Sequence, residues 1–261
     1  MILKINNSNF GNFSTKRYLY LFLLLLLCQV IFWFKFRTLE QELEVVSTPP
    51  SENTMKAFTF GDDEFYFRFK SFEVQNMGDT FGRFTSLKKY DYNKLYGWFK
   101  ELEKLNYVSN YLPSLAAYYF SQTPKIEDRR YIVKFLQEHA LKDLEKKWWW
   151  LYQASFIANY DLKDKDLAVS IASKLKDVKN APVWAKQTAG IYLAQSGNSC
   201  EAIRVMSEVV NDLENSDEKD KKKKEEELDY MEYFINRELE KLKEKGSFDL
   251  DQCFNNKTTK E

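Results

Sequence analysis

A long apolar run near the N-terminus is the strongest pattern in this sequence of 261 residues. Residues 18–34 carry no formal charge, and at ~1.5 Å per residue they would span roughly 25 Å as a helix, near the lower limit for a bilayer core. Lys35 extends this span by reaching toward the headgroups, and Tyr18 and Trp33 suit the two interfaces. The pattern predicts a transmembrane helix over residues 18–36.

The flanks of this run indicate a signal anchor that stays uncleaved. Lys16 and Arg17 precede it, as basic residues precede the apolar part of a secretory signal, but no small residues follow it to form a cleavage site. A lipoprotein is disfavoured because Leu27, which is not small, precedes Cys28. This polarity places residues 1–17 in the cytoplasm and the rest of the chain outside it, in the periplasm if the source is a bacterium.

The remaining chain divides into five segments by composition. Residues 37–56 are polar and proline-rich, so they are predicted to be a linker. Residues 57–214 form the predicted α-helical domain, and residues 215–227 form a linker crowded with charges of both signs. An amphipathic helix is predicted over 228–244, either as a cap on the domain or as a short coiled coil, and a flexible tail over 245–261.

Helical periodicity dominates the predicted domain. Residues 65–72 fit both a strand alternation and helical spacing, and the helix is preferred, whereas Gly78 to Arg83 must form a turn. From Asp91, a plausible N-cap, apolar residues recur on one face of each segment. The clearest such stripe consists of Leu95, Trp98, Phe99, Leu102 and Leu105. Helices joined by short polar breaks predict an all-α fold of antiparallel hairpins stacked in series.

Two segments near the end of this domain repeat at a fixed distance. Ala168 and Ala202 are 34 residues apart, and each lies at the start of an amphipathic helix. Gly190 and Gly197 then fall on small-residue and turn positions of the same register, and Pro182 opens the second unit. Over residues 146–214 the chain therefore resembles a tetratricopeptide-repeat protein, whose period is 34 residues.

The first of the two units departs from that pattern, since Phe156 occupies the small-residue position and Lys163 the turn glycine. The resemblance implies a superhelix whose concave face binds an extended peptide or a partner helix, and it implies no catalytic residues. An anchor followed by such repeats is also similar to periplasmic tetratricopeptide proteins that assist secretion and envelope assembly.

Composition narrows the classes of partner. Thirty-nine basic and 39 acidic residues cancel, so no global field favours nucleic acid. Of the three cysteines, Cys28 lies in the apolar run. Cys200 and Cys253 could form one disulfide outside the cytoplasm, but two separate thiols are the preferred interpretation.

Few residues or motifs in the sequence suit catalysis. His139 is the only histidine, and a structural role is preferred for it. No cluster has metal-ligand spacing, and neither a Walker loop nor a serine nucleophile elbow occurs. We therefore expect no enzymatic activity, cofactor or metal, although a pair of carboxylates acting on the cell wall remains a third alternative.

The three consecutive tryptophans are the most unusual local feature. Neighbouring helical residues point ~100° apart, so all three cannot face one core, and either one stays partly exposed or adjacent helices cover them all. We expect a binding scaffold for another envelope or secreted protein, with self-assembly through the membrane helix and residues 228–244 as the alternative. The expected contact residues are Trp148, Trp149, Trp150, Trp184, Tyr192, Arg130 and Lys186.

Overall fold

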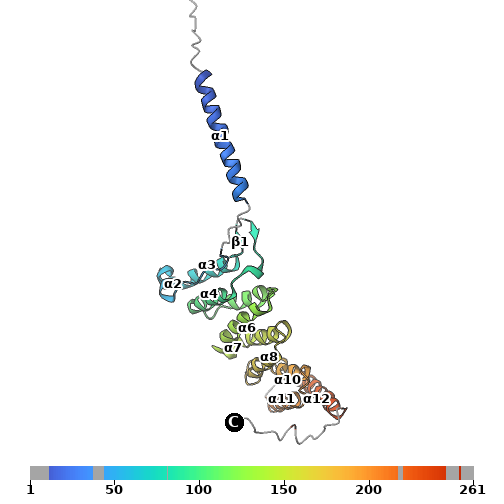
Figure 1. Ribbon diagram of the computed structural model, residues 1–261. Helices are drawn as coiled ribbons and strands as arrows, with labels where there is room; N and C mark the ends of the chain where they lie inside the picture. The colour runs from blue at the N-terminus through green and yellow to red at the C-terminus, as the bar shows by residue number, and fades with distance from the viewer. Residues whose placement is uncertain (1–11, 38–43, 81, 217–219, 245–252, 254–261) are drawn as a thin grey trace, which may run out of the picture. The chain divides into compact units, whose positions relative to one another are not determined.

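The chain forms two compact units, residues 1–44 and residues 45–261. The computed structural model describes residues 12–37, 44–80, 82–216, 220–244 and 253 (Figure 1). In the first unit, helix α1 covers Asn12–Phe36, and its stretch Arg17–Phe36 is long and apolar enough to cross a membrane. Most of the predicted cytoplasmic tail lies outside the described residues.

The second unit opens with two helices and a small β-ladder. Helix α2 covers Glu52–Thr59, and α3 covers Asp63–Gln75. Asp62 caps α3 by accepting a hydrogen bond from the Phe65 backbone N–H, so residues 65–72 are helical as preferred from the sequence. Strands β1 (Asp79–Thr80) and β2 (Arg83–Phe84) then pair antiparallel across the expected turn.

The rest of the second unit is a succession of helices, three of which run on into π- or 3₁₀-helical turns. They are the 3₁₀ turn Leu87–Lys89, α4 (Tyr92–Leu105), α5 (Tyr111–Ser114) with turns Leu115–Tyr119 and Phe120–Gln122, α6 (Ile126–Leu141), α7 (Leu144–Phe156) with the π-helical turn η4 (Ile157–Asp161), α8 (Lys165–Ala172) with Ser173–Leu175, α9 (Val183–Lys186), α10 (Thr188–Gln195), α11 (Ser199–Glu214) and α12 (Lys221–Glu244). Apart from the β-ladder, the regular secondary structure in the described part of the unit is thus helical.

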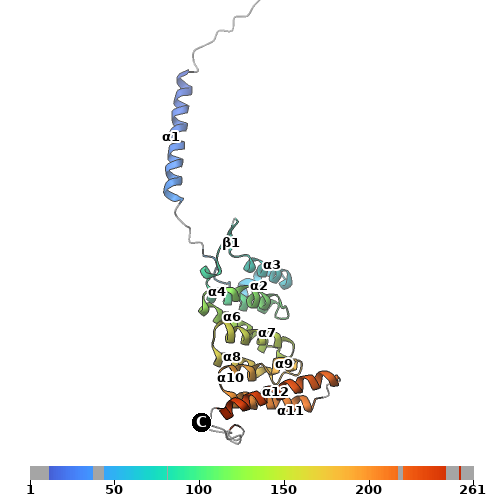
Figure 2. The same ribbon diagram turned by 90° about the vertical axis from the view of Figure 1, so that its right-hand side faces the viewer.

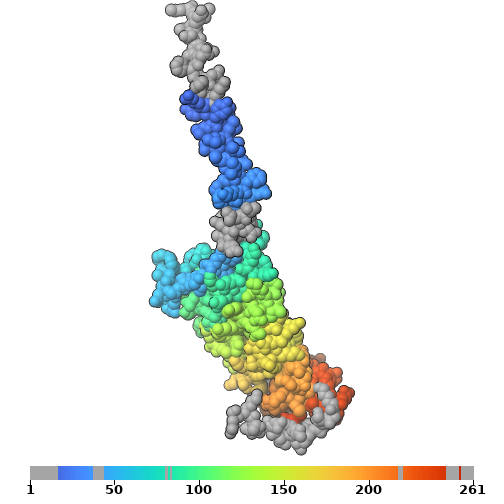
Figure 3. All heavy atoms as spheres, viewed as in Figure 1, coloured from blue at the N-terminus to red at the C-terminus, as the bar shows by residue number. Residues whose placement is uncertain are grey.

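Each of these helices packs mainly on its neighbours in the chain. Contacts run from α4 to α6, then through α7, α8, α10 and α11 to α12. In Figure 3 the colours of this unit accordingly follow one another in sequence order. The stripe predicted on α4 faces this packing: Leu95, Phe99 and Leu102 are fully buried, and the Phe99 ring lies 4.8 Å from that of Phe135 on α6.

The backbone repeats after 34 residues in the region of the sequence repeat. Helix α8 begins at Lys165 and α11 at Ser199. The turn before each helix contains a residue with positive φ, Lys163 at 56° and Gly197 at 83°. Glycine adopts this conformation without strain, whereas a side chain with a β-carbon does not. The turn position of the first repeat, Lys163, is therefore left-handed although it is not a glycine.

Small residues sit where α10 crosses α11. Ala202 is fully buried, as is Ala168 at the equivalent place on α8. A β-carbon on Gly190 would lie 3.4 Å from the carbonyl oxygen of Ala202 and 3.4 Å from Met206 Cε. The backbones of the two helices therefore approach closely at this glycine.

The predicted linker over 37–56 is partly folded, which corrects its boundary. Val46 is buried, the Trp98 indole donates a hydrogen bond of 2.7 Å to the carbonyl of Ser47, and Pro49 packs on α4. A β-carbon on Gly97 would lie only 2.9 Å from Pro49 Cγ, so this glycine permits the contact. A few apolar residues such as Val46 and Pro49 produce no helical or strand periodicity, so the sequence does not reveal that this segment packs on the unit.

The C-terminal boundaries also differ from the prediction. Helix α12 begins at Lys221 rather than at 228, because the charged residues form its first turns. Its apolar stripe packs on α11 through Met231 and Phe234, as Figure 2 shows for the two helices lying side by side. Apart from Cys253, the predicted flexible tail lies outside the described residues.

The two cysteines of this unit are joined. Cys200 and Cys253 form a disulfide with their Cα atoms 5.1 Å apart, so the preferred interpretation as separate thiols is wrong. Sequence spacing alone does not reveal such a pair, because two cysteines 53 residues apart meet only through the tertiary structure.

Candidate partner-binding groove

An aromatic groove lies between alternate helices of the second unit. Its walls come from α7 with η4, from α9 and α10, and from the start of α12, and it has a volume of about 420 Å³. The lining residues are Tyr152, Phe156, Tyr160, Trp184, Gln187, Thr188, Ile191, Tyr192, Glu226, Glu227 and Tyr230. Helices α8 and α11 contribute no lining residue, so the groove belongs to one face of the helical array.

The spacing of residues along α7 produces one wall of the groove. Trp149, Tyr152, Phe156 and Tyr160 follow one another at intervals of three or four residues, so they share one helix face. Leu151, on another face, is fully buried in the core. The π-helical turn η4 carries the aromatic stripe onward to Tyr160, whose ring lies 4.7 Å from that of Phe156.

Trp184 lies at the centre of the aromatic cluster. Its ring is 5.0 Å from Tyr152, 5.8 Å from Trp148 and 6.3 Å from Trp149, in each case with the rings close to perpendicular. Edge-to-face contacts of this kind hold large rings in fixed positions. Even so, 43% of Trp184 remains exposed, so it presents an apolar face to any molecule in the groove.

The charge of the groove is negative. Glu226 and Glu227 line the wall contributed by α12, and among the described lining residues none is basic. Burial raises the pKa of Tyr152 and also that of Tyr192, so their hydroxyls stay neutral at physiological pH. Glu226 also forms an ion pair of 3.8 Å with Lys222 on α12, so part of its charge is offset within that helix.

The expected contact residues fall into three groups. Trp184 and Tyr192 line the groove, and Trp148 and Trp149 pack half-buried around Trp184. Trp150 is buried instead, and its indole N–H donates a hydrogen bond of 2.9 Å to Asn110 Oδ1. One tryptophan thus faces the core while both of its neighbours stay partly exposed, so the triplet shows neither of the two arrangements considered, in which at most one ring is exposed.

Two expected polar contacts do not line the groove. Arg130 forms ion pairs with Asp164 at 2.9 Å and with Glu127 at 3.1 Å on the surface. Lys186 is half-buried on α9. The sequence reasoning also missed the α12 wall, although the four-residue spacing of Tyr152, Phe156 and Tyr160 is visible in the sequence.

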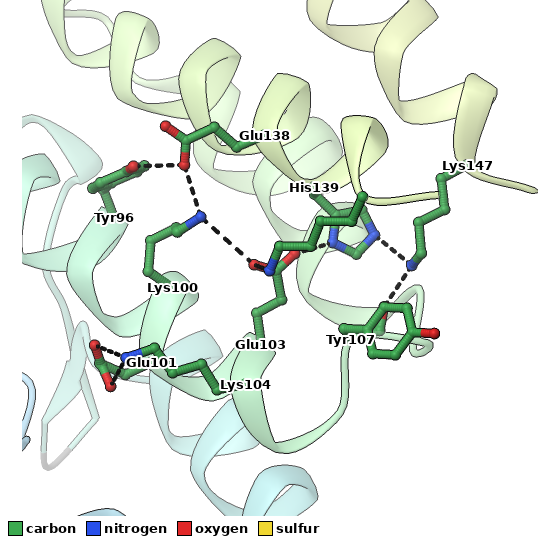
Figure 4. A network of polar contacts seen from close by, with 10 residues as sticks. Tyr96, Lys100, Glu101, Glu103, Lys104, Tyr107, Glu138, His139 and Lys147 are labelled. Atoms are coloured by element: carbon green, nitrogen blue, oxygen red, sulfur yellow. Dashed lines mark hydrogen bonds and ion pairs between the residues drawn. The ribbon is translucent and has the colours of Figure 1, made fainter. Parts of the chain in front are cut away.

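A second group of polar side chains is a buried charged network that links α4, α6 and α7 (Figure 4). Glu103 and His139 are each only 1% exposed, and Glu103 Oε1 lies 2.5 Å from His139 Nδ1. On the other side of the ring, Lys147 Nζ lies 2.8 Å from His139 Nε2 and donates to the Tyr107 carbonyl at 2.5 Å. Lys142 also pairs with Glu103.

The geometry of this network sets its protonation. An ammonium group only donates, so His139 Nε2 accepts from Lys147, and the proton on Nδ1 goes to Glu103. Burial and the charge of Lys147 lower the pKa of His139. Burial opposes ionisation of Glu103, but hydrogen bonds from His139 and Lys142 outweigh this and lower its pKa.

The network joins α4, α6 and α7, and its imidazole is enclosed by the protein. Because both partners of the imidazole are buried with it, the ring has no edge open to a substrate. In the described ranges, moreover, no group of three or more His, Cys, Asp or Glu side chains is placed to hold a metal ion. The groove is therefore the better candidate for a functional site.

Comparison with known proteins finds no relative of this chain. Neither a family model, nor a curated protein, nor a solved structure matches the chain. The function is therefore inferred from the geometry of the groove and from the sequence.

Proposed function

We propose that this protein is a membrane-anchored scaffold whose helical unit binds a segment of another protein. Helix α1 is the anchor, and the aromatic groove is the binding site. The observation that carries the proposal is the exposed face of Trp184 at the centre of a rigid aromatic cluster. Large rings held in place lose little entropy on binding, so such clusters dominate the energy of many interfaces.

The 34-residue repeat supports the tetratricopeptide-like part of the proposal. Equivalent helix starts at Lys165 and Ser199, and left-handed turns at Lys163 and Gly197, agree with that register. In a tetratricopeptide-like array the concave face takes an extended peptide or a partner helix. The groove, lined by alternate helices, is suited to that role.

The occupant is a peptide segment that carries a basic side chain. The exposed faces of Trp184 and the tyrosines accept a cation through cation–π contact, and the charged residues that line the same space are acidic. Apolar parts of the same segment would cover Phe156 and Ile191. Complementary charge of this kind contributes mostly to partner choice and to the rate of association.

The proposed location is the extracytoplasmic side of the membrane. The basic residues before the apolar run favour this orientation. The Cys200–Cys253 disulfide supports it, because disulfides persist in oxidising compartments and are rare in the cytoplasm. In a bacterium the compartment would be the periplasm.

The alternatives receive less support from the structure. Self-assembly through α12 would use its apolar stripe, but Met231 and Phe234 are already covered by α11. A glycoside hydrolase needs two carboxylates on opposite sides of the bond that is cleaved. Glu226 and Glu227 are consecutive residues of one helix, so they belong to the same wall of the groove.

Crosslinking in intact cells followed by capture of the full-length protein tests the proposal. The wild type is compared with Trp184→Ala in the groove and with Tyr233→Ala, which removes an exposed ring from α12 outside the groove. We expect one dominant partner that Trp184→Ala loses and Tyr233→Ala retains, in cells grown at a temperature where urea titration shows that both variants remain folded. Recovery of the protein alone, or equal capture by both variants, would contradict the proposal.

A further inference from the structure

Helix α3 has two apolar faces, and only one of them is covered. Tyr66, Phe67 and Val74 point into the unit and are buried. Phe65, Phe69 and Phe72 lie at positions i, i+4 and i+7, so they share another face. These three side chains are between 49% and 67% exposed, and the rings of Phe65 and Phe69 stack at 6.4 Å.

Two more phenylalanines are exposed at the end of the neighbouring helix α2. Phe58 lies in its last turn, and Phe60, which follows the helix, is 93% exposed. Phe60 has a φ of 49°, a conformation that disfavours a residue with a β-carbon. A ring held at a turn in this way suggests that its exposure has a use. We call Phe58, Phe60, Phe65, Phe69 and Phe72 the phenylalanine surface.

Exposed phenyl rings in this number need a covering partner. Scattered apolar residues are normal on a protein surface, but a cluster marks a binding site for protein or membrane. Helices α2 and α3 pack on each other, and in Figure 3 the light-blue segment that contains them lies at the edge of the second unit. Among the described residues, none covers the outer face of α3.

The position of this surface in the chain indicates what covers it. Helix α1 ends at Phe36 and the second unit begins at Val45. A chain of that length reaches about 30 Å at most. We propose that the phenylalanine surface binds the bilayer in which α1 is anchored, with its rings among the upper acyl chains. The tether makes this contact intramolecular, which raises its occupancy. The inference rests on the anchoring proposed above but not on the groove.

The charges around this surface favour an apolar contact that does not require anionic lipid. Residues 52–76 contain five acidic and three basic residues. Each basic side chain has an acidic partner: Lys56 pairs with Glu52 at 2.7 Å, Arg68 with Glu64 at 2.6 Å, and Lys70 with Glu73 at 2.5 Å. The binding energy therefore comes from burying rings, and zwitterionic lipid should suffice.

Photocrosslinking of the full-length protein in phosphatidylcholine vesicles tests this inference. Benzoylphenylalanine replaces Phe65 or Phe69 in separate variants, a conservative change for an exposed ring. Phe32 in α1 is the positive site, and Tyr233, exposed on α12, is the negative site. We expect lipid adducts at 65 and 69 at least about tenfold above those at 233, because burying a single phenyl ring shifts an equilibrium by more than that. High salt should leave the yield unchanged.

The outcomes separate the inference from the proposals on which it rests. Lipid adducts at 32 but not at 65 or 69 would overturn the inference while leaving the anchor intact. Adducts at none of these sites would overturn the anchoring as well. Crosslinks from 65 or 69 to a second copy of this chain in place of lipid would also overturn the inference, because they would show that protein covers the surface.

Discussion

Replacement of Glu103 by glutamine should destabilise the helical unit strongly. The change conserves volume but removes the carboxylate that accepts from His139 at 2.5 Å and pairs with Lys142. The ammonium group of Lys147 then stays buried with only neutral partners, His139 and the Tyr107 carbonyl. Breaking a buried pair in this way typically costs 3–5 kcal/mol, and because Lys142 can turn to solvent we expect about 3 kcal/mol.

Urea unfolding of the full-length protein in detergent micelles, followed by tryptophan fluorescence, measures this loss. At a slope of about 3 kcal/mol per molar urea, the midpoint should fall by roughly 1 M. The control is Glu138→Gln, which removes a partly exposed carboxylate paired with Lys100 at 2.7 Å and should cost less than about 1 kcal/mol. Adding Lys147→Met to Glu103→Gln removes the buried cation and should recover part of the loss.

The reasoning would be refuted if Glu103→Gln lowered the midpoint no more than Glu138→Gln does. Strict additivity of Glu103→Gln and Lys147→Met would also contradict it, because residues in one network are expected to couple by at least about 0.5 kcal/mol. Both results would mean that the buried charges do not depend on one another.

Three further predictions concern other parts of the chain. His139 is buried and neutral with a pKa below its usual 6.5, so the unfolded state takes up the proton first as the pH falls. The free energy of unfolding should therefore fall by up to about 1.4 kcal/mol per pH unit below pH 6.5. Urea titrations at pH 7.5 and 5.5 measure this slope, which His139→Asn should lack. Lys163→Gly should stabilise the unit by about 1 kcal/mol and Gly197→Ala should destabilise it by a similar amount, because the backbone is left-handed at both positions. A loss of stability in Lys163→Gly would contradict the described turn. The double change Glu226→Gln with Glu227→Gln should weaken partner binding by about fivefold at low salt and less at high salt, as measured by titration, and an unchanged affinity would exclude a basic occupant.

Local periodicity made the helices predictable. The stripe of Leu95, Phe99 and Leu102 is buried as expected, since a one-sided apolar helix has to cover that side. The apolar run of α1 was equally visible, because few structures other than a membrane span need so long an uncharged helix. Both patterns lie within a single element, so no tertiary information is required to find them.

Features that depend on distant segments were not predictable. The α12 wall of the groove brings Tyr230 near Tyr152, residues far apart in the sequence, and the charged start of α12 has no apolar period to indicate a helix. The disulfide between Cys200 and Cys253 likewise joins residues 53 positions apart in the sequence. Trp150 could not be told from its neighbours by type, because the helix rotation alone decides which ring faces the core.

The central claim is that the aromatic groove holds a segment of another protein, and photocrosslinking from within the groove in intact cells tests it most directly. Benzoylphenylalanine is placed at Tyr160 in the groove or at Tyr233 outside it, both exposed rings of the same type. The account predicts a covalent adduct with one partner from position 160 and none from 233. The adduct from 160 should disappear when Trp184→Ala is added. Adducts of equal yield from both positions, or an adduct from 160 that survives Trp184→Ala, would contradict the account.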